Sequence, residues 1–178
     1  IIGTLPLFVV LPIHKQVQAL GNNMVFIGAA LVVTGFLLFV CDLVRKGNKT
    51  ERNATVLDVL IVGAGQAIAT MPGISRSGMT ITTGCFVGFE RKFAVRFSFL
   101  LSIPAVLGAN ILSLKDAVEA GIVWAEVPMY LVGVVTAAVV GYACIRLLRL
   151  VAEKGRFGAF AYYCWAVGLL TLLLNAVK

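Results

Sequence analysis

The chain has 178 residues; 60% are hydrophobic, only 13% are charged, and the mean hydropathy is +1.00. Because soluble domains carry about 25% charged residues, this composition excludes an ordinary soluble domain and an intrinsically disordered chain. Lys and Arg outnumber Asp and Glu by 15 to 8, which gives a net charge of +7. The basic residues are scattered over short stretches beside apolar segments, so they indicate cytoplasmic loops of a membrane protein and not a nucleic-acid surface.

Residues 1–13 are apolar from the start, with neither a charged leader region nor a small-residue cleavage site. This pattern does not indicate a signal peptide; it is typical of the end of a membrane helix, so we expect the sequence to be one piece of a longer protein. His14 follows in a polar turn beside Lys15 and is not expected to be catalytic. Residues 24–44 are the first run long enough to cross a bilayer, which takes about 20 residues of helix.

Region 57–89 is apolar at both ends but is broken in the middle by Gly, Pro and polar residues. Each half is shorter than the roughly 20 residues that a crossing helix needs. Two short apolar halves around such a break predict a re-entrant helical hairpin. Three longer apolar runs follow, and they predict transmembrane helices at about 97–114, 127–150 and 157–177.

The positions of the basic residues support this topology, because short cytoplasmic loops are rich in Lys and Arg. If 57–89 crossed the membrane once, the first two basic clusters would lie on opposite faces. If it enters and leaves on one side, all three clusters lie inside, whereas segment 13–23, the acidic segment 115–126 and the C-terminus lie outside. The clusters are Arg45, Lys46, Lys49 and Arg52; Arg91, Lys92 and Arg96; and Arg146, Arg149, Lys154 and Arg156.

The break of the hairpin, residues 72–80, reads P-G-I-S-R-S-G-M-T. Arg76 at membrane depth costs about 2.5 kcal/mol or more, so it is retained only where it is paired, hydrated or facing a cavity. Its neighbours supply hydroxyl groups, glycine backbone N–H groups and the N-terminus of a helix expected to restart near Gly78, all of which favour a tetrahedral anion such as phosphate. The predicted phosphate-binding residues are Gly73, Ser75, Arg76, Ser77, Gly78 and Thr80.

Two alternatives stay open at this point. Arg76 could belong to a purely structural break and pair with a carboxylate elsewhere in the chain. Gln66, in the first half of the hairpin, could be a polar group that supports the anion site from behind or a hydrogen-bond contact between helices.

The stretch 66–81, QAIATMPGISRSGMTI, closely resembles the P-G-x-S-R-S-G-x-T signature of the undecaprenyl pyrophosphate phosphatase (bacitracin-resistance) family. The stretch FSFLLSIP at 97–104 and the spacing of the later helices resemble that family too, over essentially the whole chain. The resemblance implies an all-α, polytopic integral membrane protein built from two inverted repeats, each with a re-entrant hairpin followed by spans. Residues 1–56 would end the first repeat, and 57–178, with the hairpin at 57–89, would form the second.

The resemblance also implies an enzyme that hydrolyses undecaprenyl pyrophosphate to undecaprenyl phosphate and inorganic phosphate. This reaction recycles the lipid carrier of peptidoglycan synthesis in the bacterial inner membrane. Carried over by position, Arg76 would hold the pyrophosphate, Ser75 and Thr80 would contact phosphate oxygens as further catalytic residues, and Ser77 would support the loop. A divalent metal ion, Mg²⁺ or Ca²⁺, would bridge the pyrophosphate.

The family's N-terminal motif, with its glutamates, serine and histidine, is absent from this sequence. The metal ligands are therefore expected from an N-terminal part of the same protein and not from this chain. Water and serine both remain candidates for the nucleophile, and membrane lipids are expected partners. A homodimer is left open. The alternative function is a transporter or flippase that binds a phosphorylated lipid through the same loop without cleaving it, because broken helices are common in transporters.

Overall fold

The computed structural model describes residues 2–10, 12, 14–44, 47–121, 127–154 and 158–176, and every regular element in these ranges is a helix. Their α-helical content and lack of strands confirm the predicted all-α class. The elements are η1 (Ile2–Thr4), α1 (Leu5–Val10), α2 (His14–Ala19), η3 (Leu20–Asn22), α3 (Met24–Leu43), α4 (Val56–Ile68), α5 (Arg76–Phe86), α6 (Arg91–Ala120), α7 (Val127–Lys154) and α8 (Gly158–Ala176).

Four of these helices are long and apolar enough to cross a bilayer, and they match the four predicted spans. The apolar stretches are Met24–Leu43, Arg91–Lys115, Val127–Leu147 and Gly158–Ala176. Pro104 lies inside α6 without ending it, as membrane helices tolerate. The protein is therefore a multi-pass membrane protein.

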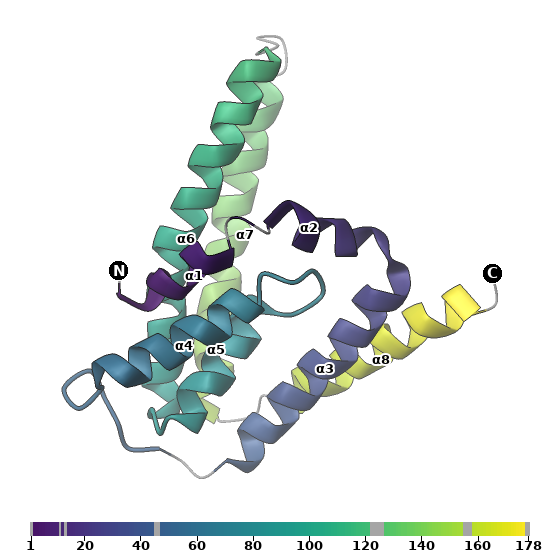
Figure 1. Ribbon diagram of the computed structural model, residues 1–178. Coiled ribbons are helices and arrows are strands. Elements are labelled where there is room, and N and C mark those ends of the chain that lie inside the picture. Colours follow the sequence, from purple (N-terminus) through teal and green to yellow (C-terminus); the bar gives the residue numbers. More distant parts are fainter. Residues whose placement is uncertain are drawn as a thin grey trace.

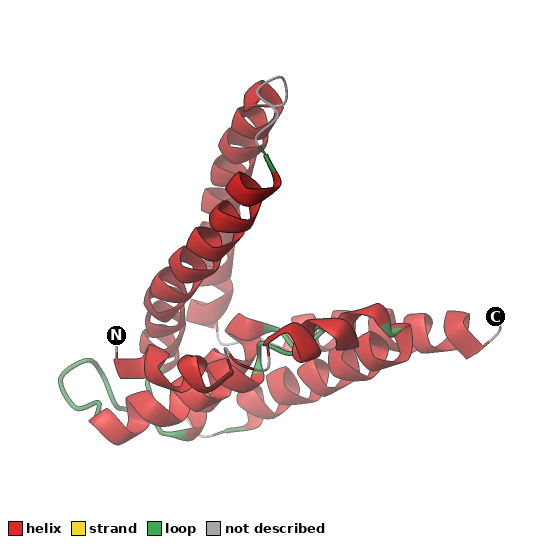
Figure 2. Cartoon of the chain, turned by 45° about the horizontal axis from the view of Figure 1, so that its top comes forward, coloured by secondary structure: helices red, strands yellow, loops and turns green. Residues whose placement is uncertain are grey.

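The long helices form two arms (Figures 1 and 2). α3 and α8 run antiparallel and pack along their length, and the ring of Trp165 in α8 packs at a tilt against Phe36 and Phe39 at centroid distances of 5.1 and 5.5 Å. α6 and α7 form a second antiparallel arm that projects away from the other helices. α4 and α5 lie between the arms as a helical hairpin, whose tip is the turn of residues 69–75.

The core lies where α3, α4, α5 and the start of α6 meet. Phe89 is fully buried there, and its ring lies 4.8 Å from that of Phe93 and 5.6 Å from that of Phe97, measured between centroids. Val62 of α4 and Cys41 of α3 are equally buried against this cluster. The hairpin is thus fixed to two of the long helices by apolar packing, which is worth roughly 25 cal/mol per Å² of apolar surface.

The ends of several helices converge near the open end of the hairpin, which we call its mouth. Arg91, the first residue of α6, donates to the backbone oxygens of Cys41 and Asp42 at the end of α3, at 3.3 and 3.0 Å. The N–H of Gly158, which starts α8, donates to Asp42 Oδ2 at 2.6 Å. Lys49 pairs with the end of the hairpin: its N–H donates to Gly88 O at 3.0 Å.

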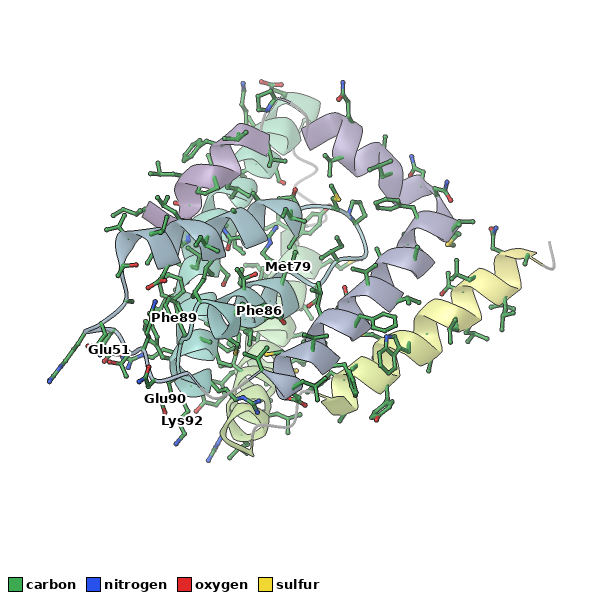
Figure 3. The ribbon with its side chains drawn as sticks, turned by 60° about the horizontal axis from the view of Figure 1, so that its bottom comes forward. Glu51, Met79, Phe86, Phe89, Glu90 and Lys92 are labelled. Carbon is green, nitrogen blue, oxygen red and sulfur yellow. The ribbon has the colours of Figure 1, made fainter. Side chains whose placement is uncertain are left out.

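The charged residues at the mouth include Glu51, Glu90 and Lys92, which Figure 3 shows gathered at that side of the hairpin and which are all exposed. One member of each of the first two predicted basic clusters, Lys49 and Arg91, has its contacts at this mouth. Arg45, Lys46 and Arg156 lie outside the described residues. The sidedness of the loops and the re-entry of the hairpin stay predictions.

The structure corrects the predicted loop at 115–126. α6 continues through Ala120, so that Lys115 and Glu119 lie one turn apart on it, with Nζ and Oε1 separated by 3.7 Å. Charged residues end an apolar run, but they do not end a helix. The signal that ends α6 is Gly121, which has a φ of +90°, a conformation that glycine adopts easily after a helix. Residues 122–126 lie outside the described residues.

The N-terminal segments also differ from prediction. Residues 1–13 were expected to end one membrane helix, but the described part holds the short helices η1 and α1. The expected loop 13–23 contains α2 and η3, so His14 starts a helix and does not lie in a turn. η1 packs on α4 where Gly63 has no side chain, because a Cβ there would overlap the carbonyl of Gly3. This close approach gives the N-terminal segment a packing role that periodicity does not reveal.

Candidate active site

The site lies at the tip of the hairpin, and the N-terminus of α4 fixes one limb of it. Thr55 caps α4: its hydroxyl accepts from the Asp58 N–H at 3.2 Å, and the Asp58 carboxylate accepts from the Thr55 N–H at 3.0 Å. This reciprocal capping box satisfies two backbone donors at once. Lys49 Nζ donates to both Asp58 oxygens at 2.9 Å. The mouth of the hairpin is therefore closed by hydrogen bonds on both limbs.

Asp58 is nearly buried, and α4 is not among the four candidate spans. The hydrogen bonds from Lys49 and from the Thr55 N–H hold the pKa of the Asp58 carboxyl below its ordinary value of 3.8. The carboxylate is thus ionised at neutral pH and is committed to the capping box and the ion pair. It is engaged in structure at the mouth, away from the tip.

The second limb begins earlier than expected. α5 starts at Arg76 and not near Gly78, because Ser75 is its N-cap and its Oγ accepts from the Gly78 N–H at 3.1 Å. A serine N-cap supplies the acceptor that the first turn of a helix lacks. The N–H groups of Arg76 and Ser77 have no acceptor within the described residues. They leave the positive end of α5 available to an anion.

A cavity of about 430 Å³ opens at this helix end, between the tip, α5 and α6. Its polar lining comes from Arg76, Ser77 and Thr80 of α5 and from Ser98 and Ser102 of α6. Its apolar lining comes from Ala69, Ile74, Phe99 and Val106. A cation, four hydroxyl-bearing neighbours and an apolar wall therefore share one cavity.

Arg76 is half-buried on this wall, and within the described part of the chain its guanidinium has no hydrogen-bond or ion-pair partner. A partly buried cation without a carboxylate partner is costly unless water or an anionic ligand accompanies it. The structure thus gives no support to the alternative in which Arg76 pairs with a carboxylate of this chain. Its planar fork of donors suits two oxygens of a phosphate group.

Thr80 links the two helices that form the cavity. Its hydroxyl lies 2.5 Å from Ser98 Oγ and also contacts the backbone oxygens of Arg76 and Ser77, at 3.0 and 3.2 Å. A hydroxyl has one proton, so when Thr80 donates to a backbone oxygen, Ser98 must donate to Thr80. Both residues are nearly fully buried. Ser102 donates to the Phe99 oxygen at 2.8 Å, one turn further along α6.

The predicted site residues therefore divide into two groups. Arg76, Ser77 and Thr80 line the cavity, and their binding of phosphate stays a prediction. Gly73, Ser75 and Gly78 lie behind it in the tip and the first turn of α5, where Ser75 serves as the cap. Direct contact between these three and phosphate stays a prediction.

Gln66 lies on α4 and is fully buried, and neither its Oε1 nor its Nε2 has a hydrogen-bond partner in the described residues. It does not line the cavity. The structure therefore gives no contact between helices through this amide, and its predicted support of the site from behind stays a prediction.

Sequence reasoning missed Ser98 and Ser102 as members of the site. A signal was present: they are four residues apart in an apolar run, and residues at i and i+4 lie on one face of a helix. Both belong to the stretch FSFLLSIP, which was noted for its resemblance and not for its hydroxyls. What the spacing could not show is that this face turns toward Arg76.

The described residues do not by themselves suit a divalent metal ion. They contain no group of three or more His, Cys, Asp or Glu side chains close enough to hold one. Mg²⁺ and Ca²⁺ take oxygen ligands, carboxylates above all, whereas the cavity wall offers only hydroxyls and a cation. Protein ligands for a metal would have to come from beyond the described residues.

Comparison with known proteins shows the family of this chain. Relatives named undecaprenyl-diphosphatase include one from Methanothermobacter thermautotrophicus, 43% identical over 97% of this chain and 96% of its own length. Two others, from Desulforapulum autotrophicum and Halothermothrix orenii, are both 40% identical over 99% and 85% of this chain. The chain spans only 64% and 58% of the lengths of these two. The family model described as bacitracin resistance protein BacA matches residues 1–170, and the chain belongs to this family.

Proposed function

We propose that the protein hydrolyses undecaprenyl pyrophosphate to undecaprenyl phosphate and inorganic phosphate, and so recycles the lipid carrier of cell-wall synthesis in the bacterial plasma membrane. The observation that carries the proposal is the guanidinium of Arg76, which has no partner among the described residues and lies in a cavity lined with hydroxyl groups. The names of the relatives support the same reaction. Because the chain covers only part of two of these relatives, the activity is proposed for the whole protein.

Binding of the pyrophosphate begins at Arg76. Its fork of N–H donors takes two phosphate oxygens, and Ser77 adds its hydroxyl and its backbone N–H, which has no acceptor in the described part of the chain. The N-terminus of α5 contributes the partial positive charge of its backbone. These groups are positioned before the substrate arrives, so they stabilise negative charge without reorganising during the reaction.

In the reaction, an oxygen nucleophile bonds to the terminal phosphorus while the bond from that phosphorus to the bridging oxygen breaks. The bridging oxygen leaves with the lipid monophosphate, keeps the electron pair and takes up the proton that the nucleophile loses. If a serine attacks, water then hydrolyses the phosphoserine to release inorganic phosphate. Arg76 neutralises the charge that spreads over the transferred phosphoryl group. Water and Ser77 are both candidates for the nucleophile, and exposure of the Ser77 side chain at the cavity supports the second.

The apolar wall of the cavity indicates where the lipid tail of the substrate lies. Ile74, Phe99 and Val106 line the cavity next to the polar groups. α6 continues beyond them with exposed apolar residues such as Leu107 and Ile111. The isoprenoid tail lies along this face, where burial of each CH₂ group contributes about 0.8 kcal/mol.

A divalent ion, Mg²⁺ or Ca²⁺, is part of the proposal. When bound, it would supply positive charge that offsets the negative charge of the pyrophosphate. Its protein ligands come from beyond the described residues, in an N-terminal part of the same protein. The proposal also places the hairpin as a re-entrant element of the second of two inverted repeats.

The test is phosphate release from undecaprenyl pyrophosphate by the full-length protein in detergent, with and without a chelator. We expect chelator-sensitive release, and Arg76→Ala should lower kcat/KM by about 10²–10³-fold, the usual effect of losing one donor to a developing oxyanion. The kcat/KM of Arg76→Lys should lie between those of wild type and Arg76→Ala, because lysine keeps the charge and loses the planar fork. Arg52→Ala, in an exposed turn away from the cavity, is the matched control.

Unchanged release by Arg76→Ala would refute the role of Arg76. No release by folded wild-type protein that still binds the lipid would favour the transporter or flippase alternative, in which the same cavity holds a phosphate head group without cleaving it.

A further inference from the structure

Thr34 lies in the middle of α3, far in sequence from the hairpin, and only 2% of its surface is exposed. Its hydroxyl reaches the tip: Oγ1 donates to the backbone oxygen of Gly73 at 3.4 Å and accepts from the N–H of Ser75 at 3.2 Å. One side chain therefore holds the backbone on both sides of Ile74, the residue that precedes the cap of α5.

Threonine hydroxyls in the described residues either bond within their own helix or bridge to another segment, as Thr82 does when its Oγ1 donates to Leu37 O at 3.3 Å. Thr83, Thr136 and Thr171 each donate to the backbone oxygen four residues earlier in their own helix, at 2.8 Å, which is the ordinary local bond of a helical threonine. Thr34 instead bonds to a segment 39 and 41 residues away. The hydroxyl contributes to the position of the tip and not to the helix that carries it.

A second contact between α3 and the tip lies one helical turn before Thr34. Gly73 has a φ of +88°, and a Cβ on it would lie 2.8 Å from the Cβ of Ala30 and 3.1 Å from the backbone oxygen of Ile27. Residues 27, 30 and 34 lie on one face of α3, at the i, i+3 and i+7 spacing. We call this face of α3, made by residues 27, 30 and 34, the seat of the tip. Of the three residues, only Thr34 has a side chain that can form hydrogen bonds.

The seat determines where the anion-binding cation lies. Ser75, held through its N–H, caps α5 through its hydroxyl, and Arg76 is the next residue. Without the Thr34 hydroxyl, a half-buried N–H and a backbone oxygen lose their partner in an apolar setting, where an unsatisfied group is costly. The tip must then move to regain a partner, and Arg76 moves with it.

We propose that Thr34 is a positioning residue of the anion site: it holds the backbone of Gly73 and Ser75 so that Arg76 and the N-terminus of α5 face the cavity. The proposal rests on the proposed function for its kinetic test. It assigns to the first described span a direct part in shaping a site whose lining comes from the tip, α5 and α6.

The test compares three variants of the full-length protein in detergent. Thr34→Val removes the hydroxyl and keeps the shape, Thr34→Ser restores the hydroxyl, and Thr171→Val removes a hydroxyl that bonds only within α8. We expect Thr34→Val to lower kcat/KM for phosphate release by about 10- to 100-fold, since a displacement of 1 Å can cost about 100-fold. The loss should appear mainly as a higher KM, and Thr34→Ser should recover most of it. Thr171→Val should match wild type.

Binding of inorganic pyrophosphate, measured by calorimetry on the same samples, separates this proposal from the proposed function. If wild type binds pyrophosphate but releases no phosphate, the proposed function fails, and weaker binding by Thr34→Val alone still supports the positioning role. If Thr34→Val binds pyrophosphate and releases phosphate as well as wild type does, the positioning role of Thr34 is overturned. A Thr34→Ser variant as defective as Thr34→Val would overturn it too, because the effect would then come from packing. If Thr34→Val does not fold, Thr34→Ala gives the same comparison without the branched methyl.

Discussion

The substitution Gly73→Ala tests the seat of the hairpin tip most directly. Two costs act together at this position. The φ of +88° is a left-handed conformation that alanine adopts at a cost of about 1–2 kcal/mol. The new Cβ would also lie 2.8 Å from Ala30 Cβ, closer than real Cβ contacts. Neither Ala30 nor the backbone of Ile27 can rotate away, so the tip must shift, and overpacking of this kind costs about 1–3 kcal/mol.

Gly88→Ala is the matched control for the cost of the left-handed backbone conformation. Gly88 has a φ of +92°, nearly that of Gly73, but a Cβ there would meet only the side chain of Lys49 at an ordinary 3.8 Å. The two costs at Gly73 sum to about 2–5 kcal/mol, whereas Gly88→Ala should show only the backbone cost of about 1–2 kcal/mol. The difference between the variants measures the contact of the tip with α3.

The assay is the unfolding midpoint in a titration with SDS, followed by kcat/KM for phosphate release on the fraction that remains folded. We expect Gly73→Ala to be less stable than Gly88→Ala and to lose activity beyond what its folded fraction explains, because Arg76 follows the tip. Equal stability of the two variants, together with full activity of Gly73→Ala, would refute the inference that α3 seats the site.

Two further predictions concern the framework. Asp58→Asn removes the charge that binds Lys49 and should lower stability by about 1 kcal/mol near pH 6, given that the pair is partly exposed. Hydrogen bonds hold the pKa of Asp58 below its ordinary value of 3.8, so this stabilisation is present above about pH 4 and is lost as the pH falls through the lowered pKa. The SDS midpoints of wild type and variant should therefore approach each other as acid protonates the carboxylate. A gap that does not narrow on acidification would contradict the charge-based explanation. Gly35→Ala places a Cβ into the indole of Trp165 and should cost about 2 kcal/mol by loosening α3 from α8, whereas Gly133→Ala, with open space around it, should leave the SDS midpoint unchanged or slightly raised.

At the tip of the hairpin, part of the candidate site was predicted from the sequence and part was not. Arg76, Ser77 and Thr80 were expected from one contiguous stretch, because an arginine among glycines and hydroxyls has few roles in an apolar segment. The start of α5 was placed two residues late, since Gly78 was taken as the restart and the capping hydroxyl of Ser75 was not. An N-cap is defined by a side-chain hydrogen bond to one backbone N–H, and the sequence alone does not show which serine of the stretch makes that bond.

The sequence by itself determined the membrane class and the four spans and predicted an anion site, because each depends on residues that are neighbours along the chain. Only the tertiary structure decided which partners complete that site. Ser98 faces Thr80 across two helices, and Thr34 bonds to a turn about forty residues later. Such pairings depend on how helices rotate and cross when they pack, and an apolar run with one polar residue is compatible with many rotations. Packing selects the single rotation in which these hydroxyls meet the tip.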